Sequence, residues 1–360
     1  MRPRPEVHVV VPHGVDDPLH PSGGNTYDRR ACQGLHRNGW RVHEHHVAGT
    51  WPQPDPWARA ALTAVLDAIP CGSVVLVDGL VGCAAPDVLV RQADRLRVVV
   101  LMHLPLGVVD AEHRPGEKAV LAAAAGIVVP SRWASAWVLD EYGLPPDLVH
   151  LVPPGVDAAR ATVAEGDGGR FVCVGAVTPL KGHDVLVDAL ATLPDLPWQC
   201  SCVGALDVDT DFARALRGHV ADTGMAGRVI FCGPLVGTRL EEAYGAADLL
   251  LLPSRREAYG MVVTEALARA VPVAAADVGG VREALGADSL GNIPGLLYAP
   301  GDADGLADAL RSWLTDPELR GSLRQRALSR RETLTGWPES AARLADVLDG
   351  VLAGGHRARG

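Results

Sequence analysis

The chain has 360 residues, 48% of them hydrophobic, so we expect two α/β domains because one core rarely organises that much chain. A formal net charge of −10 at pH 7 argues against nucleic acid as a partner and against docking on anionic lipid through a general basic surface. No apolar run approaches the ~18 residues of a membrane span, and the start, Met-Arg-Pro-Arg-Pro-Glu, lacks a signal-peptide core. We therefore expect a soluble, cytoplasmic protein without stable membrane insertion.

The first half alternates apolar runs with amphipathic segments, which is typical of a parallel sheet covered by helices. The run from Val7 to Val11 ends at Pro12, and a polar loop leads through Gly23-Gly24 into a helix that ends at Gly39. Two glycines at a helix entrance let another molecule approach the backbone closely. Further strands are expected at 42–47, 74–77, 98–102 and 127–129, the last closing the sheet, with helices at 58–69, 87–96 and 135–142.

One strand of this half is rich in histidine, Val42-His43-Glu44-His45-His46-Val47, and has the composition of a metal site. In a strand, His43 and His45 share one face while His46 points to the other. No Asp, Glu or Cys set at ligand spacing accompanies them. We therefore interpret them as solvated strand histidines rather than zinc ligands.

His103 comes directly after the strand expected at 98–102. Ligands of open parallel sheets gather outside the carboxyl ends of the strands, so this histidine is a candidate site residue. The loop after the first strand adds His13, Asp16 and Asn25. They are candidate contacts to an acceptor, meaning a second substrate that would receive a transferred group, and no motif supports them.

The second half repeats the alternation after a polar, Gly-rich linker at 158–169. The run Asp207-Val208-Asp209-Thr210-Asp211 is interpreted as an N-cap with an acidic first turn rather than a metal site. Strands are expected at 171–177, 198–203, 228–232, 249–252, 271–275 and 295–298, and helices at 212–223, 239–246, 302–314, 318–334 and 339–352.

The stretch from Leu252 to Leu267 joins an anion-binding helix start to two carboxylates. A strand stops at Pro253, a short loop follows, and a helix opens near Tyr259-Gly260. The unpaired N–H groups and partial positive charge of a helix start attract phosphate. The carboxylates of Glu257 and Glu265 instead suit sugar hydroxyls, from which they accept hydrogen bonds. Together these features predict a nucleotide-sugar site.

The pair Glu257 and Glu265 resembles the Glu-x7-Glu motif of the family-4 retaining glycosyltransferases, which have the GT-B fold. Lys181-Gly182 and the Pro-x-Gly-Val-Asp signature at 153–157 resemble further motifs of that family. The resemblance implies two doubly wound, Rossmann-like parallel-sheet domains that face each other across a cleft. The expected domains are an acceptor-binding domain at 1–157, on which a C-terminal helix within 337–360 packs back, and a nucleotide-sugar-binding domain at 158–336.

The resemblance also implies roles for single residues. Glu257 would hold hydroxyls of the donor sugar, Glu265 the nucleotide ribose, Lys181 the pyrophosphate, and His103 would lie near the reacting centre. Donor-binding roles are further implied for Gly23, Gly24, Gly233, Tyr259, Gly260, Met261 and Val262. The family's usual second cation, an arginine in a Gly-Arg pair, is Ala176 here, and Arg255, Arg256 and Arg132 are the candidate substitutes.

The implied function is retaining transfer of a sugar from a nucleoside diphosphate, UDP in preference to GDP, to a small soluble acceptor. No metal or other cofactor is expected, because a helix start and cationic side chains take that place. Two alternatives stay open: a protein that binds nucleotide sugars without transfer, and a GT-B epimerase. The sequence determines neither the acceptor nor the oligomeric state.

Overall fold

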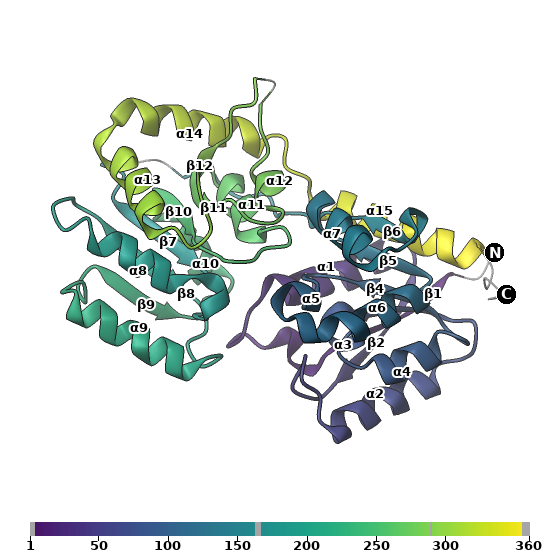
Figure 1. Ribbon diagram of the computed structural model, residues 1–360. Coiled ribbons are helices and arrows are strands. Elements are labelled where there is room, and N and C mark those ends of the chain that lie inside the picture. Colours follow the sequence, from purple (N-terminus) through teal and green to yellow (C-terminus); the bar gives the residue numbers. More distant parts are fainter. Residues whose placement is uncertain (1–3, 163–166, 289, 355–360) are drawn as a thin grey trace. The chain divides into compact units, whose positions relative to one another are not determined.

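The computed structural model describes residues 4–162, 167–288 and 290–354 and divides into two compact units. Unit 1 comprises residues 1–16, 23–155 and 335–360, and unit 2 comprises residues 17–22 and 156–334 (Figure 1). The chain thus leaves unit 1 after Gly155 and returns after Leu334, two residues before each boundary expected from the sequence. Part of the expected linker, residues 163–166, lies outside the described residues.

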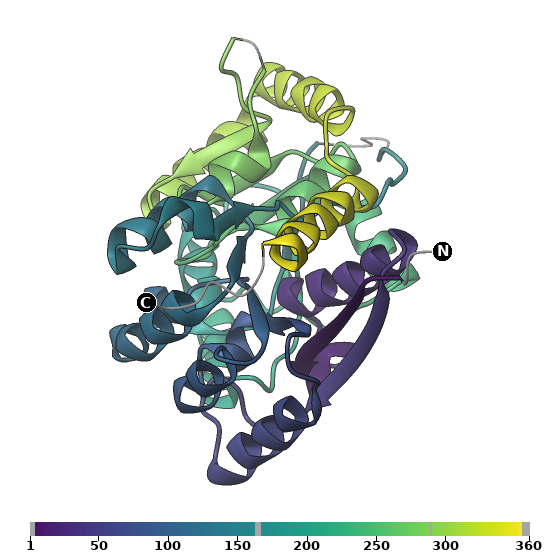
Figure 2. The same ribbon diagram turned by 90° about the vertical axis from the view of Figure 1, so that its right-hand side faces the viewer.

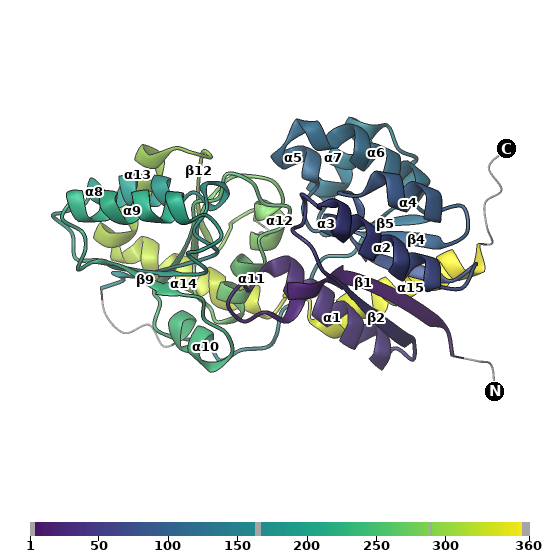
Figure 3. The ribbon, with the colours of Figure 1, turned by 90° about the horizontal axis from the view of Figure 1, so that it is seen from below.

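Unit 1 is built on a parallel sheet in the order β2-β1-β3-β4-β5-β6. Helices α2, α4, α6 and α7 pack on one face, while α1 and α15 cover the other (Figure 3). The strands are β1 Glu6–Pro12, β2 Arg41–Val47, β3 Val74–Asp78, β4 Arg97–Leu101, β5 Gly126–Val129 and β6 Val149–Leu151. The helices are α1 Gly23–Arg37, α2 Pro56–Ala68, α3 Gly79–Gly82, α4 Pro86–Gln92, α5 Leu106–Val109, α6 Arg114–Ala123, α7 Arg132–Tyr142 and α15 Trp337–Ala353, with 3-10 turns η1 His13–Asp16, η2 Ala111–His113 and η3 Pro146–Leu148.

The prediction that the strand at 127–129 closes this sheet is wrong, because β6 pairs with β5 as an additional edge strand. β6 has three residues, all of them half-buried, and its middle residue is His150. A run of three residues with a histidine in the middle lacks the continuous apolar character that marks an inner strand of a parallel sheet. Pairing with β5, rather than its own composition, makes this segment a strand.

Helix α15 packs lengthwise against α1 (Figure 2). The two helices come so close that a Cβ placed on Gly34 would lie 2.2 Å from Cβ of Ala341. A side chain of any size at position 34 would therefore push the helices apart. The last described helix thus belongs to the core of unit 1, although about 180 residues of unit 2 precede it in the chain.

Unit 2 repeats the architecture with the strand order β12-β11-β10-β7-β8-β9, all parallel. Helices α8, α9 and α13 pack on one face and α10, α11 and α12 on the other, while α14 contacts both α13 and α11 (Figure 3). The strands are β7 Arg170–Val174, β8 Gln199–Val203, β9 Val229–Gly233, β10 Leu249–Leu252, β11 Val273–Ala276 and β12 Gly295–Tyr298. The helices are α8 His183–Ala191, α9 Thr210–Asp222, α10 Thr238–Gly245, α11 Met261–Ala268, α12 Val281–Leu285, α13 Ala303–Thr315 and α14 Pro317–Arg331, with a 3-10 turn η4 Pro179–Lys181.

The acidic run at 207–211 caps a helix, as predicted. The backbone N–H of Phe212 donates a hydrogen bond of 3.0 Å to Oδ1 of Asp209, which is the N-cap of α9. The carboxylate thereby pairs one of the free donors of the first turn. Among the described helices, none has both the length and the apolar character that a membrane span requires.

The histidines of β2 form a cluster with a histidine of β1. His43 and His45 share one face, as predicted, and both rings stack on His8, at centroid distances of 4.8 and 5.2 Å. Nδ1 of His8 lies 2.9 Å from Nε2 of His45, so a hydrogen bond joins the rings only when one of these nitrogens is unprotonated. The three side chains are half-buried rather than fully solvated, because β1 brings His8 over the pair.

This cluster predicts a loss of stability in mild acid. Burial and the neighbouring imidazoles lower the pKa of His8 and of His45. The unfolded chain therefore binds more protons than the folded one just below pH 6.5, and the stabilisation is lost as the pH falls through that range. Urea unfolding at pH 7.5 and 5.5 should show a smaller pH effect in His45→Asn than in the wild type. The matched variant His36→Asn, at an exposed position of α1, should keep the wild-type pH effect; equal pH effects in all three proteins would contradict the prediction.

Candidate functional site

The strand-end loops of unit 2 bring Lys181 and Glu257 into contact. Lys181 follows β7 and Glu257 follows β10, and these two strands are neighbours in the sheet. Nζ of Lys181 lies 2.5 Å from Oε1 of Glu257, and the hydroxyl of Ser254 donates to the same oxygen at 2.9 Å. The lysine side chain remains 32% exposed, so its ammonium can still meet a ligand. Two of the predicted site residues thus form one polar centre.

A glycine allows these two loops to lie so close. Gly182 has φ +67°, and a Cβ at this position would lie 2.0 Å from the carbonyl oxygen of Pro253. Any side chain would therefore both strain the backbone and displace the loop after β10. The close contact between these two loops explains why a glycine follows Lys181.

Helix α11 begins directly after the same loop. Gly260, with φ +90°, is its N-cap and offers no side-chain cap, so the first turn keeps unpaired N–H groups at Met261 and Val262. The positive end of the helix dipole lies at the same place. The half-buried Tyr259 lies directly before this helix start. Free N–H groups and the helix dipole suit an anion, and the binding role of these residues stays a prediction.

Glu265 lies in the second turn of α11 and is half-buried. Its Oε2 accepts a 2.7 Å hydrogen bond from the hydroxyl of Tyr244, a residue of α10. Burial raises the pKa of Glu265, while this hydrogen bond and the charge of Arg269 favour its ionised form. Sequence reasoning did not identify Tyr244, because its contact with Glu265 depends on how α10 packs beside α11.

The three candidate substitutes for the family arginine differ in their hydrogen-bond partners and in their positions in the fold. The guanidinium of Arg255 donates to both carboxylate oxygens of Asp184, at 2.8 and 2.7 Å, and to the carbonyl of Pro179. Arg256 is exposed and donates to the carbonyl of Arg255, and Arg132 begins α7 in unit 1. In unit 2, Arg255 is therefore already neutralised by an internal carboxylate.

In unit 1, the predicted site residue His103 lies beside two aspartates and the first turn of α1. Nε2 of His103 lies 3.0 Å from Oδ1 of Asp28 and 3.5 Å from Oδ2 of Asp78. Asp28 comes from α1 and Asp78 from the end of β3. The first turn of α1 covers the imidazole, because a Cβ on Gly24 would lie 3.1 Å from Cδ2 of His103. The sequence prediction named Gly23, Gly24 and His103 but neither aspartate; the position of Asp78 at a strand end was the available signal.

Opposing effects determine the protonation of these three groups. Burial alone would lower the pKa of His103, but the two carboxylates raise it to about 10. Burial, with the charge of Asp78, raises the pKa of Asp28 to about 8. Hydrogen bonds and the charge of His103 outweigh burial and lower the pKa of Asp78. At pH 7 the histidine is therefore a cation, and its charge favours the ionised form of both carboxylates.

Asp28, Asp78 and His103 also meet the geometric requirement for a shared cation. One ligand atom of each lies within 4.8 Å of the others, and among the described residues this is the only such group of His, Cys, Asp and Glu. The protonated imidazole already compensates the buried carboxylates at this position. That the protein works without a metal stays a prediction.

The remaining predicted contacts lie at the corresponding strand ends. His13 and Asp16 are exposed in η1, directly after β1, and Asp16 lies 3.4 Å from Arg29. Asn25, in the first turn of α1, donates to the carbonyl of Gly14. In unit 2, Gly233 ends β9 with φ +69°. Their binding roles stay predictions.

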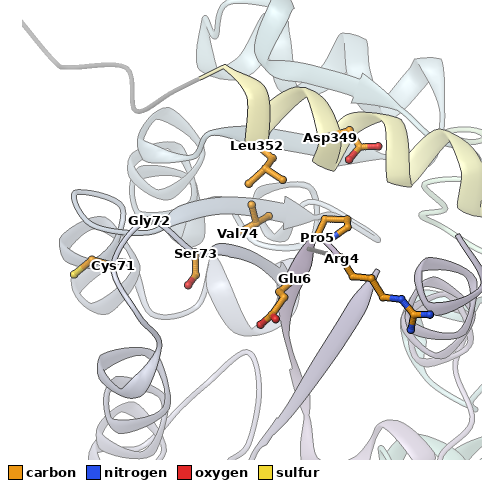
Figure 4. Close-up of a pocket in the computed structure, with 9 residues that line it drawn as sticks. All are labelled: Arg4, Pro5, Glu6, Cys71, Gly72, Ser73, Val74, Asp349 and Leu352. Carbon is orange, nitrogen blue, oxygen red and sulfur yellow. The ribbon is translucent and has the colours of Figure 1, made fainter. Parts of the chain in front are cut away.

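A separate hollow of about 570 Å³ lies at the other end of the sheet of unit 1 (Figure 4). Its lining residues are Arg4, Pro5, Glu6, Cys71, Gly72, Ser73, Val74, Asp349 and Leu352. Glu6 and Val74 begin β1 and β3, so the hollow lies at the amino ends of the strands. Ligands of parallel sheets bind at the carboxyl ends, and we do not assign this hollow to the site.

Comparison with known proteins agrees with this arrangement. Residues 157–330 match the family described as glycosyl transferases group 1. The chain is 34% identical over 251 residues to D-inositol 3-phosphate glycosyltransferase of Xylanimonas cellulosilytica, covering 64% of this chain and 58% of that protein. It is 32% identical over 290 residues to the protein of the same name from Jonesia denitrificans, covering 71% of this chain and 67% of that protein. The chain therefore matches somewhat less than two thirds of the length of several such relatives.

Two solved structures share the fold along almost the whole chain. Sucrose-phosphate synthase from Thermosynechococcus elongatus superposes with a TM-score of 0.80 at 23% identity, covering 98% of this chain and 100% of that one. Anabaena HepE, solved in complex with UDP and glucose, has a TM-score of 0.77 at 17% identity and coverages of 95% and 99%. The two six-stranded parallel sheets are those of the GT-B glycosyltransferases. Within that class, the chain belongs to the glycosyl transferases group 1.

The pKa of His103 can be measured directly. We expect its ring to stay protonated up to about pH 10, whereas a model histidine releases its proton near 6.5. Histidine ring resonances followed by NMR against pH, with His103→Gln to assign the signal, test this expectation. Asp78→Asn should lower the pKa of His103, and the exposed His36→Asn should leave it unchanged. A His103 ring that titrates near 6.5 in the wild type would contradict this expectation.

Proposed function

We propose that this protein transfers a sugar, with retention at the anomeric carbon, from a nucleoside-diphosphate donor to a small acceptor. The observation that carries the proposal is the contact between Lys181 and Glu257 beside the start of α11. A cation and a helix start suit the diphosphate, and a carboxylate suits the sugar hydroxyls. We propose UDP in preference to GDP as the carrier, and a cytoplasmic location; both rest on the sequence prediction.

The names of the relatives support a phosphorylated acceptor. Several relatives are D-inositol 3-phosphate glycosyltransferases. We therefore propose a sugar phosphate or cyclitol phosphate as the acceptor class, which narrows the small soluble acceptor expected from the sequence. D-inositol 3-phosphate is the first compound to test.

Lys181 and Glu257 would exchange partners when the donor binds. The ammonium of Lys181, now paired with Glu257, would turn to the diphosphate, and the freed carboxylate would accept hydrogen bonds from sugar hydroxyls. As the bond from the anomeric carbon to the diphosphate oxygen breaks, negative charge grows on the leaving group. Lys181 and the N–H groups of Met261 and Val262 would stabilise that charge more strongly than the ground state, which accelerates cleavage.

The described residues of this centre offer no obvious nucleophile, and the proposal uses front-face attack. The acceptor oxygen bonds to the anomeric carbon on the face that the diphosphate leaves, and its proton passes to the departing diphosphate oxygen. In unit 1, His103 would act as a fixed cation near the reacting sugar, held in that state by Asp28 and Asp78.

One observation favours a second candidate, which is binding of a nucleotide sugar without transfer. Ala176 replaces the family arginine, and Arg255 is occupied by Asp184. The leaving group would then be less well stabilised. Incubation with donor and acceptor followed by product analysis separates the two candidates, because donor binding without donor loss in any acceptor mixture favours the second.

A thermal-shift screen should identify the donor. A ligand that binds only the folded chain at 100 times its Kd adds about 2.7 kcal/mol of stability. One set of UDP-sugars or GDP-sugars should therefore raise the Tm by several degrees, and free sugars should not. If none of these nucleotide sugars shifts the Tm, the proposed donor class is wrong.

Lys181→Ala and Glu257→Ala should each lower turnover at least ~100-fold, since each would remove a few kcal/mol of transition-state stabilisation. Lys118→Ala is the matched control, because Lys118 is the other lysine of the chain and is exposed in α6. Initial rates at saturating donor and acceptor provide the measurement. Near-normal rates in either site variant would count against the assignment.

A further inference from the structure

We propose that Tyr244 and Arg269 form a clamp that orients the carboxylate of Glu265 to recognise the ribose hydroxyls of the nucleotide, and so determine preference for ribonucleotides over deoxyribonucleotides. The inference rests on the proposed function, in which unit 2 binds a nucleoside diphosphate. It adds two residues that neither the sequence motif nor the comparisons assign to the site.

The carboxylate of Glu265 is only partly satisfied within the protein. Its Oε2 accepts from the hydroxyl of Tyr244, and among the described residues no hydrogen-bond donor contacts Oε1. A carboxylate has about four acceptor positions, and this half-buried side chain leaves some of them open to a ligand. Two vicinal hydroxyls of a ribose would supply the missing donors. Burial also raises the pKa of Glu265, as expected for a carboxylate short of partners.

The tyrosine that holds this carboxylate is itself immobilised. Tyr244 is fully buried in α10, so its ring has no freedom to follow a moving carboxylate. The hydroxyl therefore fixes the position of Oε2 and leaves Oε1 and the second lone pair of Oε2 for a ligand. Loss of the hydroxyl would leave Glu265 free to rotate about its side-chain torsions.

Arg269 completes the clamp by packing over the ring of Tyr244. Its guanidinium carbon lies 4.7 Å from the ring centroid of Tyr244, and Nη1 donates to the backbone carbonyl of Glu265 at 2.5 Å. Nε donates to Oε2 of Glu241 on α10 at 3.0 Å. Arg269 thus ties α10 to the end of α11, and the two helices place Tyr244 and Glu265 together. The arginine is 6% exposed, so it acts through Tyr244 and the backbone of Glu265 rather than on the ligand.

The test compares hydroxyl deletion in the ligand with hydroxyl deletion in the protein. Calorimetry on the full chain gives the Kd of UDP, 2′-deoxy-UDP and 3′-deoxy-UDP, and of the guanine counterparts. The variants are Tyr244→Phe, which keeps the ring under Arg269, and Glu265→Gln. Tyr298→Phe is the matched control: Tyr298 is a buried tyrosine of the same unit, and its hydroxyl contacts the carbonyl of Leu252 instead.

We expect the wild type to prefer the ribonucleotide over at least one deoxy analogue by about 10-fold or more, the effect of one hydrogen bond to a charged group. In Tyr244→Phe and Glu265→Gln this preference should fall below about 3-fold, and in Tyr298→Phe it should stay at the wild-type value. A merely structural role of Tyr244 would weaken all ligands equally and leave the ratio unchanged. Should Tyr244→Phe fail to fold, Arg269→Gln loosens the same clamp and should give the same loss of preference.

The outcomes separate this inference from the proposed function. If Tyr244→Phe keeps the wild-type ratio of the deoxyribonucleotide Kd to the ribonucleotide Kd, the clamp is wrong and the proposed donor site is unaffected. No preference for ribose in the wild type also overturns the clamp, and again leaves diphosphate binding intact. A wild type that binds neither UDP nor GDP overturns the proposed function and the clamp with it.

Discussion

The contact between Lys181 and Glu257 depends on the neighbouring positions of β7 and β10 in one parallel sheet. The two residues are 76 positions apart in the chain, and each stands in a loop that leaves a strand at its carboxyl end. Parallel pairing places those ends at one edge, and Gly182 lets the loops touch at the carbonyl of Pro253. A polar centre for an anion and a sugar follows from this constraint, because helix α11 begins at the same edge.

In both units a neighbouring side chain holds a carboxylate that is fully buried, in unit 1, or half-buried, in unit 2. In unit 1 the imidazolium of His103 compensates Asp28 and Asp78, and in unit 2 a tyrosine hydroxyl holds Glu265. Removing a buried charge's partner costs more than the bond itself is worth, since the charge stays behind unpaired. Such residues therefore keep one orientation, which is what recognition of a hydroxyl or of a growing charge requires.

The limits of sequence reasoning are clearest where a contact joins different elements. The apolar runs that became the inner strands were visible, since buried parallel strands are continuous and hydrophobic. Edge strand β6 was not, because three half-buried residues carry no such pattern. The sequence also showed that His43 and His45 share a face, yet the partner that stacks on them, His8, is set by the register of β1 and β2.

The sequence by itself determined the alternation of strands and helices, the helix start at Gly260 and the pair Glu257 and Glu265, because these follow from local periodicity, backbone chemistry and spacing. Only the tertiary structure decided which charges pair: Lys181 with Glu257, His103 with Asp28 and Asp78, and Arg255 with Asp184. Each of these pairs joins residues that are distant in the chain. Their distances depend on strand order and helix packing, which also bury the groups and thereby strengthen the charge interactions. Neither strand order nor helix packing can be read from the spacing of residues along the chain.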